Sequence, residues 1–184
     1  MIDISLLPLG QIEPKVLKFL KKILEEKFDC SIETKKPLGV PQHAYDAKRK
    51  QYNSTKILAF LREKSFEKAA KELALTDADL YADRLDFVFG EAEVKGKEAI
   101  ISLHRLYPQF YELESNEAIL EERVAKEAIH ELGHTFGLSH CAISACVMYF
   151  SNSIIDTDLK EKNFCSDCYN KLKAEIEREE KCLG

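Results

Sequence analysis

The hydrophobic positions at the start of the chain predict a strand, a helix and a second strand. Apolar and polar residues alternate over 2–7, which is typical of a β-strand. Over 14–27 the apolar residues recur at helical spacing, and Pro14 suits a first helical turn. Residues 30–35 indicate the second strand. This order of elements predicts a pair of parallel strands in an α/β fold.

The next part of the chain has a less regular pattern. Residues 36–53 are rich in proline and polar residues, so we expect a surface loop there. The apolar spacing over 55–64 predicts a helix that Ser54 can cap. The stretch after it fits two structures. Propensity favours a helix through Leu75, whereas residues 73–77 also fit a buried strand followed by a turn.

A second group of strands precedes the most regular helix of the sequence. Residues 87–93 and 99–103 each have the character of a strand, and the short turn between them predicts an antiparallel pair. Apolar residues then recur every four positions from about Glu117, after a capping Ser115 or Asn116, up to a stop at Gly137.

Composition and charge narrow the class of protein. The 184 residues suffice for one domain with a real core, and the net charge of −5 argues against a nucleic-acid binder. The longest hydrophobic run is six residues, 145–150, far short of the roughly 20 that a transmembrane helix needs. The N-terminus lacks the pattern of a secretory signal. We therefore expect a cytoplasmic protein with neither a membrane nor a nucleic-acid partner.

The strongest chemical signal lies at the end of the long helix. His130 and His134 are one helical turn apart, so both imidazoles lean over one patch and can share a zinc ion. Gly137 can take a positive φ and turn the chain back, which brings His140 to the same ion. Three imidazoles leave a fourth position for water, as in catalytic rather than structural zinc sites.

Glu131 and Gly133 lie between the two helical histidines, and each has a predicted role. Glu131 lies about 100° round the helix from His130, so we expect it to act as general base on the zinc-bound water and then as acid to the leaving amine. Gly133 costs ~1 kcal/mol relative to alanine inside a helix. We expect that another backbone segment approaches closely there.

Four of the six cysteines are clustered just after these histidines. They form two pairs joined by a loop, the pattern of a closed, structural four-thiolate zinc site: Cys141, Cys146, Cys165 and Cys168. Disulfides, an iron–sulfur cluster and free thiols are the alternatives, and a reducing compartment disfavours the disulfides. Because Cys141 directly follows His140, this zinc would brace the loop that carries the third catalytic ligand.

Residues 130–140 match the metzincin signature of zinc peptidases, and the pattern of residues 141–172 resembles the archaemetzincin family. The resemblance implies a mixed, mostly parallel twisted sheet with one antiparallel edge strand, for which 87–93 is the candidate, lying over the cleft and pairing with an extended peptide. It also implies that Met148 forms a Met-turn that supports the zinc without binding it. Asp158 belongs to the pattern, but its spacing assigns it no chemistry.

The resemblance also bears on activity. Archaemetzincins are regarded as zinc-dependent peptidases, with aminopeptidase-like activity in some members. Some metzincins place a tyrosine hydroxyl near the zinc, where this chain has Phe150. Loss of one oxyanion donor can cost ~10²–10³ in rate, so we expect slow turnover.

We therefore predict a single metalloprotease domain over 1–184. Its sheet and active-site helix occupy 1–137, and a small zinc-braced subdomain occupies 138–184. Two zinc ions per chain are expected, one catalytic and one structural. The predicted function is zinc-dependent hydrolysis of peptide bonds, with a peptide or protein as substrate. The alternatives are a catalytically weak zinc protein that binds peptides or a partner, and a non-peptide amidohydrolase.

Overall fold

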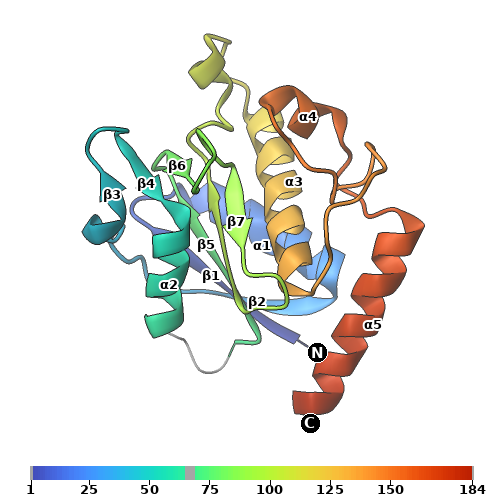
Figure 1. Cartoon of the computed structure of the whole chain (residues 1–184). Helices are drawn as coiled ribbons and strands as arrows, with labels where there is room; N and C mark the ends of the chain where they lie inside the picture. Colours follow the sequence, from blue (N-terminus) through green and yellow to red (C-terminus); the bar gives the residue numbers. More distant parts are fainter. Residues whose placement is uncertain (1, 65–68, 184) are drawn as a thin grey trace.

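The structure is a computed structural model that describes residues 2–64 and 69–183 (Figure 1). Its helices and strands follow the chain in the order β1 (Ile2–Leu9), α1 (Pro14–Phe28), β2 (Cys30–Thr34), β3 (Tyr45–Asp46), β4 (Gln51–Asn53), α2 (Ser54–Lys64), β5 (Lys71–Thr76), β6 (Leu80–Tyr81), β7 (Gly90–Ala92), β8 (Glu98–Ser102), α3 (Glu117–Thr135), α4 (Ile154–Leu159) and α5 (Ser166–Leu183). Two short 3₁₀ helices lie at Gln42–Ala44 and Pro108–Tyr111.

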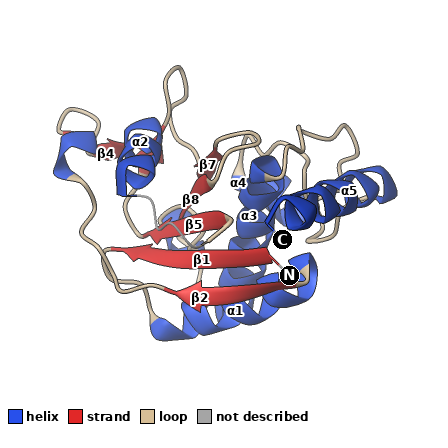
Figure 2. Ribbon diagram, turned by 90° about the horizontal axis from the view of Figure 1, so that it is seen from below, coloured by secondary structure: helices blue, strands red, loops and turns tan. Residues whose placement is uncertain are grey.

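Five strands form the main sheet in the order β2-β1-β5-β8-β7. The first four are parallel to one another, and Figure 2 shows β1 between β2 and β5. The edge strand β7 runs antiparallel to β8, with Gly90 opposite Ile101. The predicted α/β fold, its parallel opening pair and its antiparallel edge strand are confirmed. The edge strand is shorter than expected, because only Gly90–Ala92 of residues 87–93 pair with β8.

Two expectations for the middle of the chain need correction. Residues 36–53 are not a plain loop, because β3 and β4 form a small second sheet with β6. Tyr45 and Tyr52 face each other across β3 and β4, with ring centroids 4.9 Å apart, and such cross-strand aromatic pairs stabilise short hairpins. The helix through Leu75 is also wrong: the chain there is the central strand β5, as the alternative held, and all six of its residues are buried. Residues 66–68 of that expectation lie outside the described part of the chain.

The predicted N-cap residue is confirmed for α3 but is wrong for α2. Asn116 caps α3 as expected, since its side chain accepts a hydrogen bond of 3.1 Å from the backbone N–H of Ile119. For α2, the expected cap Ser54 is wrong. The side chain of Asn53 accepts the bond from the N–H of Lys56 at 2.9 Å, while the Ser54 hydroxyl donates to the carbonyl of Tyr81.

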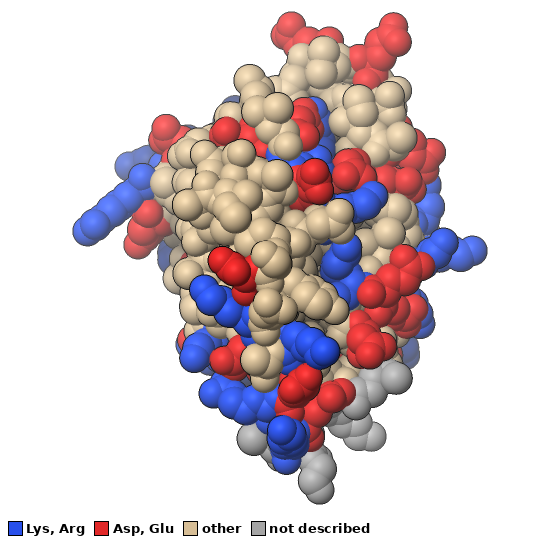
Figure 3. All heavy atoms as spheres, turned by 90° about the vertical axis from the view of Figure 1, so that its right-hand side faces the viewer, with Lys and Arg blue, Asp and Glu red and all other residues tan. Residues whose placement is uncertain are grey.

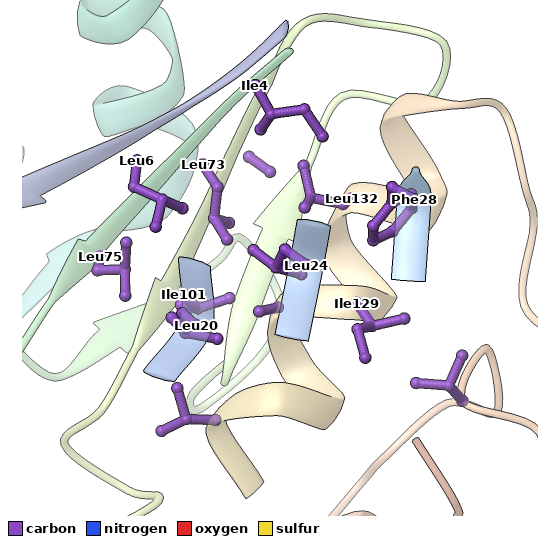
Figure 4. Close-up of a cluster of buried hydrophobic side chains, with 14 of the residues drawn as sticks. Ile4, Leu6, Leu20, Leu24, Phe28, Leu73, Leu75, Ile101, Ile129 and Leu132 are labelled. Carbon is purple, nitrogen blue, oxygen red and sulfur yellow. The ribbon is translucent and has the colours of Figure 1, made fainter. Parts of the chain in front are cut away.

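The hydrophobic core has two layers, one on each face of the main sheet. The larger lies between the sheet and helices α1 and α3, where buried side chains from all three meet (Figure 4). The smaller lies between the sheet and α2. None of the described helices is both long and apolar enough to span a membrane. On the face that carries α5, lysines and arginines are interspersed with acidic residues, so that face has no broad basic patch (Figure 3).

Candidate active site

Helix α3 positions the first two predicted ligands, and the turn after it brings the third. His130 and His134 lie in the buried last turns of α3. Gly137 has φ +85°, which reverses the chain as expected. The turn returns His140 to the helix, so that one nitrogen from each of the three imidazoles lies within 4.8 Å of the others. The structure thus brings the three predicted histidines together.

Backbone carbonyls hold two of these rings in one orientation. Nδ1 of His130 lies 2.8 Å from the carbonyl oxygen of Val147, and Nδ1 of His134 lies 2.7 Å from that of Leu138. Nδ1–H therefore donates in both rings, and each Nε2 keeps its lone pair. The two Nε2 atoms are 3.1 Å apart. A tetrahedral zinc with bonds of about 2.0–2.1 Å needs roughly 3.3 Å between two nitrogens, so the histidines fit this ion.

The electrostatic surroundings favour neutral imidazoles, the form that binds a metal. Burial lowers the pKa of His130 well below its ordinary value, and the positive charge of Lys160 lowers it further. Burial is also the main cause of the lowered pKa of His134 and of His140. The ligand set is therefore prepared to accept a cation without first losing protons.

Glu131 lies beside the histidines, as the sequence predicts. Only 5% of its surface is exposed, and its carboxylate accepts no hydrogen bond from the described residues. Burial raises its pKa well above the ordinary value; the charge of Glu127 adds to this effect, and Lys160 opposes it. A buried carboxylate with unused acceptor oxygens suits proton transfer.

These residues line a cleft of about 500 Å³ between α3 and the chain that leads into β7. Its walls are largely apolar and include Phe87, Phe89, Ala92 and Phe150. The histidines, Glu131 and Glu127 line the same cleft. The cleft is therefore a concave apolar site with a few polar groups, as small-ligand and peptide sites commonly are.

Met148 packs against Gly133 of α3 and is fully buried. A Cβ built on Gly133 would lie 2.5 Å from the sulfur of Met148 and 3.4 Å from the ring of Phe164. Gly133 thus makes room for close packing, as expected. However, the group that approaches it is a side chain rather than the expected backbone segment.

The four clustered cysteines also meet. Their sulfur atoms all lie within 4.8 Å of one another, and those of Cys141 and Cys165 are 3.8 Å apart. This separation is too long for a disulfide, but it matches the roughly 3.8 Å between sulfurs on a tetrahedral zinc with bonds of about 2.3 Å. A hydrogen bond from the backbone N–H of Cys168 lowers the pKa of Cys165 to about 7, whereas burial raises the pKa of Cys146 and of Cys168. A bound metal would therefore have to displace protons from these two thiols.

Comparisons with known proteins agree with this geometry. The model of peptidase family M54 matches residues 15–174. The archaemetzincin of Methanocaldococcus jannaschii is 49% identical over 170 residues, covering 92% of each chain, and that of Pyrococcus furiosus is 42% identical over 181 residues, covering 95% of this chain and 94% of the relative. The chain belongs to peptidase family M54, the archaemetzincins.

Solved archaemetzincin structures share its fold. The archaemetzincin of Methanopyrus kandleri aligns with a TM-score of 0.86 at 36% identity, covering 96% of each chain. That of Archaeoglobus fulgidus, complexed with malonate, aligns with a TM-score of 0.81 at 36% identity, covering 92% of this chain and 99% of the other. The protein is therefore a zinc metallopeptidase, and its mixed sheet, helices and C-terminal cysteine cluster match the solved archaemetzincins.

Two ion pairs beside the site of this archaemetzincin were missed by the sequence reasoning. Arg123 of α3 donates to both oxygens of Asp158 at 2.7 Å, which gives Asp158 a structural partner. One turn further along α3, Glu127 lies 3.0 Å from Nζ of the fully buried Lys160. Both pairs join α3 to the segment around α4. No spacing rule could have found partners more than 30 residues apart in the chain.

Proposed function

We propose that this archaemetzincin hydrolyses peptide bonds in the cleft beside α3, with Glu131 as general base and then general acid. The observation that supports this most is the position of Glu131. Its carboxylate is buried, has unused acceptor oxygens and lines the same cleft as three imidazoles whose ligand nitrogens converge.

The ligand sets support two zinc ions per chain. His130, His134 and His140 would hold the catalytic ion, and the cysteine cluster would hold the structural one. The catalytic zinc, when bound, acts as a Lewis acid that polarises the scissile carbonyl and makes water more acidic. Side chains and backbone groups of the chain itself carry out the other steps, which are proton transfer and binding of the peptide.

Glu131 moves the proton in this scheme. Its carboxylate takes one proton from the attacking water as the new C–O bond forms, and it delivers that proton to the amine nitrogen as the C–N bond breaks. Lys160 opposes the rise in the pKa of Glu131 that burial causes, which helps to keep the base ionised. The ring of Phe150, centred 4.8 Å from that of His140, has no hydroxyl to donate to the oxyanion, so we expect slow turnover.

The substrate in this proposal is an extended peptide. Strand β7 is at the edge of the main sheet, so its outer backbone groups can pair with one more strand. Such a peptide would lie along the cleft and bring a carbonyl toward the histidines. The mixed charge of the α5 face and the overall acidic charge fit a peptide substrate better than a nucleic acid. The unpaired thiols fit a reducing compartment such as the cytoplasm.

The test is turnover of a peptide library by Glu131→Gln and Glu131→Ala variants. We expect both to fold and to retain zinc, because all three imidazoles remain, and we expect hydrolysis to fall at least ~100-fold. Glu121→Gln, on the same helix but away from the cleft, is the matched control and should keep wild-type turnover. Wild-type hydrolysis by Glu131→Gln would contradict the role of Glu131.

The same library separates finer activities. Peptides with free and with blocked N-termini distinguish an aminopeptidase-like enzyme from an endopeptidase. Cleavage of free peptides alone would support the aminopeptidase-like reading implied by the family resemblance. Retention of zinc without cleavage of any peptide would favour a protein that binds peptides without turnover.

A further inference from the structure

Gly90, at the start of the edge strand β7, lies against the carboxylate of Glu131. A Cβ built on Gly90 would lie 2.6 Å from Cγ of Glu131 and 2.7 Å from its Oε1. It would also lie 2.8 Å from the backbone oxygen of Ile100 on β8. These separations are shorter than carbon contacts allow, since non-bonded carbon atoms prefer about 3.5–4.0 Å. Only glycine therefore leaves the observed position of the Glu131 carboxylate free.

The strand cannot simply move away to make room. β7 pairs with β8, where Gly90 is opposite Ile101. The turn at the far end of β7 is fixed to the end of α3, because the backbone N–H of Lys95 donates to the carbonyl of His134 at 3.0 Å. The side chain of Lys95 also covers Gly137, at 2.8 Å from a Cβ built there. Figure 1 shows β7 running alongside α3 between these points.

Of the groups that a Cβ at position 90 would meet, the Glu131 carboxylate is the easiest to displace. The oxygen of Ile100 belongs to the backbone of the sheet, whereas the end of a glutamate side chain can rotate. A substitution at Gly90 therefore displaces the carboxylate of Glu131. The 2.8 Å contact with the oxygen of Ile100 also requires a small local shift of β7 against β8. The metal ligands His130 and His134 are not among the atoms that the added Cβ would meet first.

We infer that Gly90 is a positioning residue for the reaction: its lack of a side chain sets the place of the Glu131 carboxylate and its spacing from the edge strand. The effect of Gly90 on catalysis rests on the proposed function of Glu131. The effect of Gly90 on the position of the Glu131 carboxylate does not. Gly90 does not touch the reacting atoms in this scheme. It acts through Glu131, so its loss reduces kcat rather than substrate binding.

The test compares Gly90→Ala with wild type and with Gly39→Ala. Gly39 is exposed, has no heavy atom within 4 Å of a built Cβ and serves as the matched control. We expect Gly90→Ala to retain zinc and to lose at least ~10-fold in kcat with KM within about twofold. We also expect its crystal structure to show the Glu131 carboxylate displaced. Gly39→Ala should keep the wild-type kcat.

Three results would overturn the inference: wild-type kcat in Gly90→Ala, an unmoved Glu131 carboxylate in its structure, or an equal loss in Gly39→Ala. If Gly90→Ala does not fold, the double variant Gly90→Ala/Glu131→Ala decides. It removes the glutamate atoms that the new Cβ meets, so its folding supports the inference. Its failure to fold would show that Ile100 alone requires the glycine. The crystal structure does not depend on activity, so failure of the proposed function remains distinguishable.

Discussion

Gly133 and Met148 determine how closely the loop after α3 can approach the helix. The sulfur of Met148 would be 2.5 Å from a Cβ at position 133, and Met148 is fully buried, so it has little space to move. In Gly133→Ala, overpacking should cost about 1–3 kcal/mol of the free energy of unfolding. The higher helix propensity of alanine offsets ~1 kcal/mol of this cost, so we expect a net loss of stability. Thermal unfolding measures this as a lower Tm.

The control for this prediction is again Gly39→Ala, where the added Cβ meets nothing within 4 Å. It should leave the Tm unchanged or raise it slightly, because alanine reduces the freedom of the unfolded chain. If Gly133→Ala matches the Tm of wild type or exceeds it, Met148 repacks without cost and the steric explanation is wrong.

At the scale of single residues, sequence could predict the groups that follow a local rule. The four-residue spacing of His130 and His134 predicts that they share one face of a helix. Gly137 predicts the turn that brings His140 back to this helix. The partners of Glu131 could not be predicted in this way. Gly90 lies 41 positions before it in the numbering, and its closeness arises from the packing of β7 on α3.

Helices α3 and α4 are joined by a buried ion pair beside the active site. Nζ of Lys160, at the end of α4, lies 3.0 Å from Oε1 of Glu127 on α3, and both side chains are almost wholly buried. We expect Lys160→Met to lower the free energy of unfolding by about 3–5 kcal/mol, because it leaves Glu127 buried without its cation. Denaturant unfolding of the two proteins measures the difference.

Two further variants identify the cause of that loss. The double variant Glu127→Gln/Lys160→Met removes both charges and should recover more than half of the lost stability. Arg62→Met breaks the exposed pair between Arg62 and Glu93 and should cost no more than about 1 kcal/mol. A cost for Lys160→Met as small as that for Arg62→Met would show that water reaches Glu127.

At the scale of elements, segments with a regular apolar repeat were predictable from the sequence, and segments without one were not. Helices α1 and α3 have long apolar repeats, and the structure confirms both. Strand β5 is central in the sheet and buried on both faces, so its sequence lacks the alternation that marks a half-exposed strand. The short strands β3 and β4 exist through pairing with each other and with β6, which no local pattern reveals.

Across the whole molecule, the loop between the two predicted metal sites contributes to both. His140 directly precedes Cys141, whose backbone N–H donates to the carbonyl of Met148 at 2.9 Å. Val147, which directly follows Cys146, supplies the carbonyl that orients His130. We therefore propose that the segment after Gly137 acts as a zinc-braced subdomain that holds one catalytic ligand and orients another.

If the cysteine cluster binds zinc as proposed, removal of that ion should weaken the neighbouring histidine site. The variant Cys165→Ser/Cys168→Ser removes two of the four proposed thiolate ligands. It should therefore lose the proposed zinc and the binding free energy that this zinc would add to folding stability. The loop from Cys141 to Met148 would then loosen. His140 would lose its fixed place and His130 the carbonyl that orients it, whereas His134 keeps its bond to Leu138. We expect a lower Tm and about 10–100-fold weaker affinity for the zinc held by histidines, measured by competition with a chelator.

The variant Cys30→Ser supplies the control for this last prediction. Cys30 is buried in the main core, where its thiol lies 3.6 Å from the carbonyl of Leu24, and it belongs to neither cluster. Its replacement tests the loss of a cysteine without the loss of an ion, so the affinity of the histidine site should stay at the wild-type value. The bracing idea fails if the double serine variant, confirmed to hold no cysteine-bound zinc, also keeps that affinity. The loop would then hold His140 and Val147 through its own backbone hydrogen bonds, since the carbonyl of Asn163 accepts from Val147 and that of Met148 accepts from Cys141.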